Sequence, residues 1–169
     1  ATPSDQPAQP DIGVRTFDQL NHSMSQITGV PVTNAGVRAT YLQVRQQLPP
    51  VARIEAFLAS HQTGVAQLAI KYCAAMVDDP ARRAAFFGSL NLSTPAATLF
   101  AAQSGRDALI DPLLARVVGA NLASQPADAD VRSTLSTLVD RLVTNGADSP
   151  TVAKAACAAT LGSAALTVQ

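Results

Sequence analysis

Residues 54–77 read IEAFLASHQTGVAQLAIKYCAAMV, and the spacing of side chains in this stretch decides the fold. Large side chains recur at alternating steps of four and three residues, at Ile54, Leu58, His61, Val65, Leu68 and Tyr72. Steps of four and three return to one face of an α-helix, so they predict a helix over about residues 50–77. One seam of that helix should be buried against its neighbours along its whole length.

Four prolines elsewhere follow directly after a short polar residue, in Asp79-Pro80, Thr94-Pro95, Asp111-Pro112 and Ser149-Pro150. A polar side chain at the N-cap accepts hydrogen bonds from the N–H groups of the first helical turn. Proline at the next position loses nothing, because its missing N–H would have no partner there. The four pairs therefore predict helix starts, and the pair at 111–112 fits either a start or a kink within a helix.

Further capping signals delimit the other helices. The T-x-x-Q spacing of residues 16–19 is that of a capping box, and Gly29 ends the helix it begins. Asn34 can cap a second helix, and Asn145-Gly146 is a C-terminal signal for a helix that contains Val131 and Leu142.

No segment alternates polar and apolar residues over the length of a strand, so the sequence predicts an all-α fold without a sheet. We expect a bundle of about seven or eight helices, including helical runs over 95–103 and 109–118 and a last helix from 150 to the terminus. Residues 14–169 should form a single helical domain. Residues 1–13 are rich in Pro and Gln and are expected to be a disordered leader.

The composition limits the classes of partner. Aromatic residues make up 4 % of the chain and tryptophan is absent, so the core should be rich in Ala together with Leu, Val and Ile. Twelve basic and twelve acidic residues give a net charge of zero without a basic stripe, which argues against nucleic-acid binding and against a cationic membrane-surface helix. Residues 155–168 form the longest uncharged apolar stretch, which is too short for a membrane span.

The two cysteines, Cys73 and Cys157, both lie in predicted helices among alanines. Neither belongs to a CxxC pair or has the spacing of a metal ligand. Two buried free thiols and one disulfide between two helices both remain compatible with this pattern. The small flanking residues would allow the close approach of helices that a disulfide requires.

Candidate catalytic and metal-binding residues are few. His61 lies on the apolar seam beside Gly64, where it could act as a base or contact a ligand, although a histidine at the edge of a packed core explains it more simply. His22 lies off the stripe of its own helix and is expected to be solvated. Two histidines and two cysteines without paired spacing do not predict a zinc site, so we expect no metal and no cofactor. A single glutamate and the absence of any nucleophile motif argue against an enzyme.

An alternative role for the seam is to hold a small molecule. Bundles often place ligands between facing helices, and a small apolar ligand could lie near His61 and Tyr72. The side chains that would line such a cavity are Leu58, His61, Val65 and Tyr72.

Several short blocks resemble the helical module found toward the C-terminal end of large exported bacterial proteins that carry LamG-type β-sandwich domains. The matching blocks are residues 15–18 through 27–30, 69–73, 111–114, 120–126, and 156–157 followed by 161–164. The resemblance implies a location outside the cytoplasm, where a disulfide between Cys73 and Cys157 would be stable, and so it favours the disulfide over free thiols. It implies no catalytic residues, and this chain carries no sandwich of its own.

These observations lead to an expected function. The chain should be a non-enzymatic structural or interaction domain of an exported or cell-surface bacterial protein, located extracellularly, at the cell surface or in the periplasm. Its partner would be another protein or a second copy of the chain.

Overall fold

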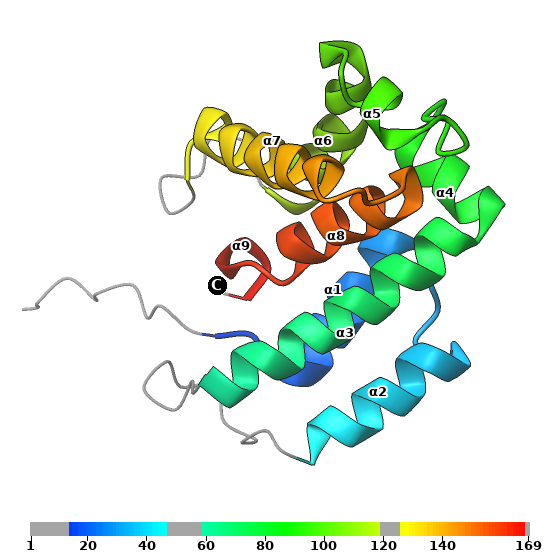
Figure 1. Cartoon of the computed structure of the whole chain (residues 1–169). Coiled ribbons are helices and arrows are strands. Elements are labelled where there is room, and N and C mark those ends of the chain that lie inside the picture. The colour runs from blue at the N-terminus through cyan, green and yellow to red at the C-terminus, as the bar shows by residue number, and fades with distance from the viewer. Residues whose placement is uncertain (1–13, 47–58, 119–125, 168–169) are drawn as a thin grey trace, which may run out of the picture.

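The computed structural model of the chain describes residues 14–46, 59–118 and 126–167, and these residues form an all-α bundle with no strand. The described residues form nine helices, which are labelled in Figure 1. Their bounds are α1 Phe17–Thr28, α2 Ala35–Arg45, α3 Ala59–Asp78, α4 Pro80–Phe87, α5 Ala96–Leu99, α6 Gln103–Val117, α7 Asp128–Thr144, α8 Ser149–Leu161 and α9 Ala164–Thr167. The predicted leader, residues 1–13, lies outside the described residues.

The first two helices begin where the capping signals predict. Thr16 forms a complete capping box with Gln19, and Gly29 ends α1 in the left-handed conformation at a φ of 69°. The side chain of Asn34 accepts hydrogen bonds from the backbone N–H groups of Gly36 and Val37 at the start of α2. Local sequence alone therefore determines these boundaries.

Helix α3 is the central element, as its seam predicted, and it packs side by side with α8 (Figure 1). His61, Val65, Leu68 and Tyr72 are all buried on it, whereas Ile54 and Leu58 lie outside the described residues. The two helices approach closely because their facing residues are small. A Cβ built on Gly162 would lie 3.7 Å from Ala66 Cα, so the backbones are separated by little more than a methyl group.

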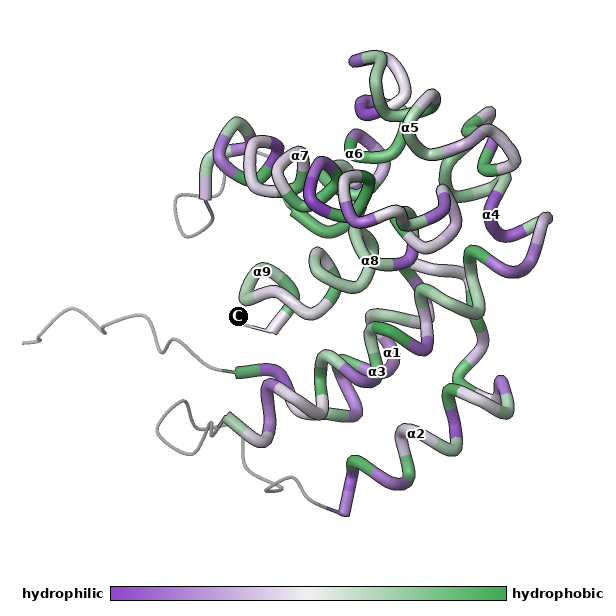
Figure 2. The backbone as a smooth tube through the Cα atoms, in the orientation of Figure 1, coloured by the Kyte–Doolittle hydropathy of each residue, from purple (hydrophilic) through white to green (hydrophobic). Residues whose placement is uncertain are grey.

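The main core joins α3 and α8 to the surrounding helices. Along the α3–α8 contact it is alanine-rich, with Ala69, Ala153 and Ala156 fully buried. Larger side chains such as Phe100 and Leu109 fill the space toward α5 and α6. Figure 2 shows that the buried α8 is mostly white to green, whereas α4 and α7, which also face water, alternate between purple and green.

Helices begin within one residue of three of the four proline pairs, at 79–80, 94–95 and 149–150, but the structure corrects the predicted capping residue at two of them. Asp79 caps α4 as predicted, with its carboxylate accepting from the N–H groups of Ala81 and Arg82. Ser149 does not cap α8, however. The cap is Asp148, one residue earlier, because the hydroxyl of Ser149 is used in a contact with a distant loop. Thr94 likewise caps nothing, since Pro95 itself has an extended ψ of 139° and occupies the N-cap position of α5.

The predicted runs over 95–103 and 109–118 are also divided differently. Helix α5 ends at Leu99, and α6 starts six residues before the predicted second run. Pro112 is inside α6, so of the two possibilities it is not a start. Where the chain turns between α5 and α6, Gly105 lies against the backbone carbonyl of Leu99, a position that has no room for a side chain. The final helix is interrupted as well, because α8 ends before Gly162 and α9 begins at Ala164.

Helices α6 and α7 are joined by a second apolar cluster and by ion pairs. Arg132 lies between two carboxylates, with Nη1 3.0 Å from Asp107 Oδ1 and Nη2 2.5 Å from Asp111 Oδ1. Arg106 Nη2 lies 2.6 Å from Asp140 Oδ1. These groups are partly exposed to water, so they define how the two helices are aligned more than they stabilise the fold.

Three aspartates, of which Asp140 and Asp148 are exposed and Asp79 is half-buried, have pKa values below the ordinary range, because hydrogen bonds favour their charged forms. The bonds come to Asp79 from the backbone of Arg82, to Asp140 from the side chain of Arg106, and to Asp148 from Thr151. A carboxylate whose pKa is lower in the folded state stabilises the fold fully above its unfolded pKa of about 3.9. That contribution is lost as the pH falls through the lower, folded value.

We therefore expect the melting temperature to fall as the pH is lowered from about 7 to about 3, because these carboxylates become protonated. The change Asp79→Asn keeps a capping oxygen but removes the charge, so it should make this fall smaller. Asp128→Asn, at an exposed position in the first turn of α7, is the matched control. Thermal melts followed by circular dichroism at both pH values test this, and equal falls in both variants would contradict it.

Candidate functional site

The two cysteines meet in the centre of the bundle. Cys73 on α3 and Cys157 on α8 are both fully buried, and their Sγ atoms lie 1.98 Å apart with a Cα–Cα distance of 5.8 Å. This geometry is that of a disulfide, which joins positions 84 residues apart in the chain. The structure thus contains the disulfide that the resemblance favoured, and not the two free thiols that spacing alone left open.

The described residues proposed to line an apolar-ligand cavity on α3 are buried among other side chains of the bundle. Val65 and Tyr72 belong to the main core cluster and are buried almost completely, and His61 is also buried. The Tyr72 hydroxyl donates to Asn21 of α1, whose Oδ1 is 2.7 Å away and whose backbone oxygen is 3.0 Å away. Burial raises the pKa of Tyr72 to about 12. Leu58 lies outside the described residues, and a ligand at this place remains a prediction.

We expect Tyr72→Phe to destabilise the protein by about 1–2 kcal/mol, because the change leaves the buried Asn21 oxygen without its donor. Tyr41→Phe is the matched control, since Tyr41 is less buried and its hydroxyl bonds to Asp18 at the surface. Urea unfolding of both variants measures the difference. Equal losses would mean that the buried hydrogen bond contributes no more than the surface one.

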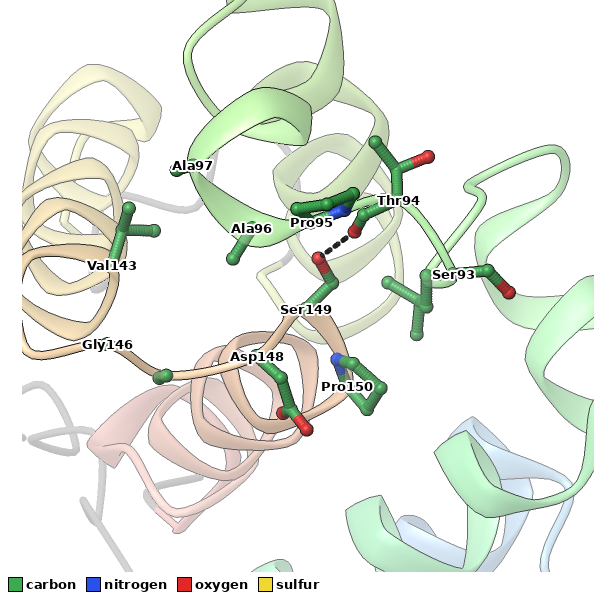
Figure 3. Close-up of a pocket in the computed structure, with 12 residues that line it drawn as sticks. Ser93, Thr94, Pro95, Ala96, Ala97, Val143, Gly146, Asp148, Ser149 and Pro150 are labelled. Carbon is green, nitrogen blue, oxygen red and sulfur yellow. Dashed lines mark hydrogen bonds between the residues drawn. The ribbon is translucent and has the colours of Figure 1, made fainter.

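A pocket of about 520 Å³ lies where the loop before α5 meets the turn between α7 and α8. Figure 3 shows how two parts of the chain far apart in sequence form it. The Ser149 hydroxyl donates to the backbone oxygen of Thr94 at 2.6 Å, which ties the α8 start to the loop. Most of the lining is apolar and comes from Leu92, Pro95, Ala96, Ala97, Val143, Ala147 and Pro150.

One charged group, Asp148, is among the described residues that line this pocket. Its Oδ1 accepts a hydrogen bond from the Thr151 N–H at 2.8 Å, and bonding to Thr151 lowers its pKa. Among the described residues no salt bridge reaches Asp148, because Lys154, which also lowers its pKa, has its Nζ 2.6 Å from Asp78 Oδ1. The pocket is therefore an apolar hollow with one fixed negative charge.

Two of the sequence signals lie on opposite sides of this pocket, although the sequence did not predict the pocket itself. Thr94-Pro95 and Ser149-Pro150 each appeared as a helix start, and both pairs line the pocket. One sequence signal could have indicated that the two pairs lie together. Asp148 is also a capping residue, and because it caps α8, the hydroxyl of Ser149 can bond to the Thr94 backbone oxygen instead. His22 is exposed as predicted, with its Nδ1 2.8 Å from the Asp18 carbonyl oxygen.

Within residues 14–46, 59–118 and 126–167, no three or more His, Cys, Asp or Glu side chains gather as metal ligands would. None of the helices in these ranges combines the length and the apolar character needed to cross a bilayer. Comparisons with protein families, curated proteins and solved structures gave no match to this chain.

Proposed function

We propose that the chain is a non-enzymatic structural or interaction domain of an exported or cell-surface bacterial protein. The observation that carries this proposal is the buried disulfide between Cys73 and Cys157. Disulfides form and persist in oxidising compartments and are rare in the cytosol, so this bond supports a location outside it. The resemblance to helical modules of large exported proteins points in the same direction.

The distribution of charge supports an interaction role over chemistry. The net charge of zero lets the chain approach a partner, or a copy of itself, without long-range repulsion. Two large apolar side chains, Leu42 on α2 and Ile70 on α3, are about half exposed, and such residues add apolar area to a contact. The rigid, disulfide-linked pair of α3 and α8 would hold such surfaces in place.

Two measurements test this function. Hydrolase and redox assays on the purified chain should show no turnover, and robust turnover abolished by a single substitution would overturn the proposal. The location is tested by expression with and without a bacterial export signal. The exported form should contain no thiol that reacts with a maleimide after denaturation, whereas the cytosolic form should contain two. An exported protein that stays reduced would contradict the assignment.

A further inference from the structure

The pocket between the loop before α5 and the start of α8 has a volume and an aliphatic lining that suit an extended side chain. Val143, Ala96 and Ala97 stand on one side of the Ser149–Thr94 hydrogen bond, and Pro150 stands on the other (Figure 3). Its volume of about 520 Å³ falls within the roughly 300–1,000 Å³ that is typical of ligand sites. These walls are aliphatic, and no aromatic ring is among the described residues that line them.

The charge in the pocket selects a cation. Asp148 is exposed, ionised at neutral pH and without a salt bridge to any described residue, so an anionic ligand would be repelled and a cationic one attracted. An aliphatic wall beside a single carboxylate matches a lysine side chain, whose four methylenes cover apolar surface while the ammonium reaches the charge.

Arginine fits this arrangement less well. A guanidinium binds best when it reaches both oxygens of a carboxylate or stacks on an aromatic ring. The carboxylate of Asp148 already accepts hydrogen bonds from Thr151, from its side chain and from its N–H at 2.8 Å, and the described residues of the lining offer no ring for stacking. An ammonium is a point charge that needs only one oxygen, so it can bind without displacing the cap of α8.

We propose that this pocket binds the side chain of a lysine from a partner protein, with the methylenes along the α5 side and the ammonium near Asp148. The inference rests on the proposed role as an interaction domain. It defines the chemistry of one contact of that domain, which is an aliphatic chain that ends in a positive charge.

The test is a titration of the ¹⁵N-labelled chain with the N-acetyl methylamides of lysine, norleucine and arginine, followed by NMR. Norleucine has the same aliphatic chain without the charge. Lysine should bind weakly, about fivefold tighter than norleucine, because one exposed ion pair contributes up to about that factor. It should also bind tighter than arginine, because the guanidinium finds neither a free pair of carboxylate oxygens nor a ring to stack on. The shifted amide signals should be those of residues 92–97 and 143–150.

Two variants in the pocket and one control outside it make the result specific. Asp148→Asn keeps a capping oxygen for Thr151 but removes the charge, so it should abolish the preference for lysine over norleucine. Ala97→Leu fills the aliphatic side and should weaken the binding of both, and Asp128→Asn, outside the pocket, should change neither. Ala97→Leu also keeps the test decisive if Asp148→Asn does not fold.

The outcomes separate this inference from the proposed function. Equal binding of lysine and norleucine, or shifts elsewhere in the chain, would overturn the lysine site and leave the interaction role to be judged by the turnover and export assays. n-Butylammonium carries the four methylenes and the ammonium of a lysine side chain without its backbone, so it should bind about as tightly as the lysine amide. Binding of the lysine amide without binding of n-butylammonium would mean that the pocket does not recognise the side chain.

Discussion

Reduction of the Cys73–Cys157 disulfide should lower the melting temperature by about 10–20 °C. The bond closes a loop of 84 residues in sequence separation, and the chain-entropy treatment gives about 4–5 kcal/mol for a loop of this length. In a domain of this size each kcal/mol corresponds to roughly 2–4 °C. Both sulfurs are fully buried, so reduction requires transient unfolding and the reductant should be added during denaturation.

The double variant Cys73→Ala/Cys157→Ala separates the effect of the crosslink from that of the side chains. Wild-type protein refolded under reducing conditions keeps both sulfur atoms and loses only the bond. Both samples should melt well below the oxidised protein, with the double variant lower by the small amount that two missing buried sulfurs cost. Identical melting of oxidised and reduced wild type, measured by calorimetry, would mean that the bond does not stabilise the fold.

The second large effect is expected at Gly105. A Cβ at this position would overlap the backbone oxygen of Leu99 and lie 3.0 Å from its carbonyl carbon. A backbone carbonyl cannot rotate away as a side chain can, so α5 and α6 would have to move apart. We expect Gly105→Ala to cost about 3 kcal/mol, equivalent to a fall of roughly 6–12 °C in melting temperature.

Gly36→Ala is the matched control for this change. Gly36 is also helical, but a Cβ there would lie 3.6 Å from Asn34 Oδ1, an ordinary contact distance. Alanine restricts the unfolded chain and favours a helix, so this variant should be neutral or more stable by up to about 1 kcal/mol. Chemical denaturation of both variants provides the comparison, and a Gly105→Ala protein as stable as Gly36→Ala would refute the close contact.

The parts of the fold that depend on residues close together in sequence could be predicted from the sequence. Asp79-Pro80, Gly29 and Asn145-Gly146 mark helix ends through bonds and φ angles within a few residues, and the structure has helix ends at each of them. The seam of α3 was visible because burial repeats with the helical period.

The sequence predictions were wrong where a contact between distant parts of the chain determines the local structure. Ser149 and Asp148 are both capping residues, and the choice between them depends on the Thr94 oxygen, 55 residues away in sequence. The break between α5 and α6 depends on Gly105 meeting Leu99, which no periodicity reveals. Spacing left the pairing of Cys73 with Cys157 open for the same reason. The pocket could not be predicted because its two sides come together only in the folded chain.

The link between α3 and α8 also determines what a protease would leave behind. The loop that contains Ser93 and Thr94 lies between the two cysteines in sequence, so a chain cut there yields two pieces that remain covalently joined. Such a nicked molecule would migrate as one intact band in a non-reducing gel and separate into two only after its sulfurs are reduced. A domain exposed to extracellular peptidases could thus be cut at this loop and still hold both halves together.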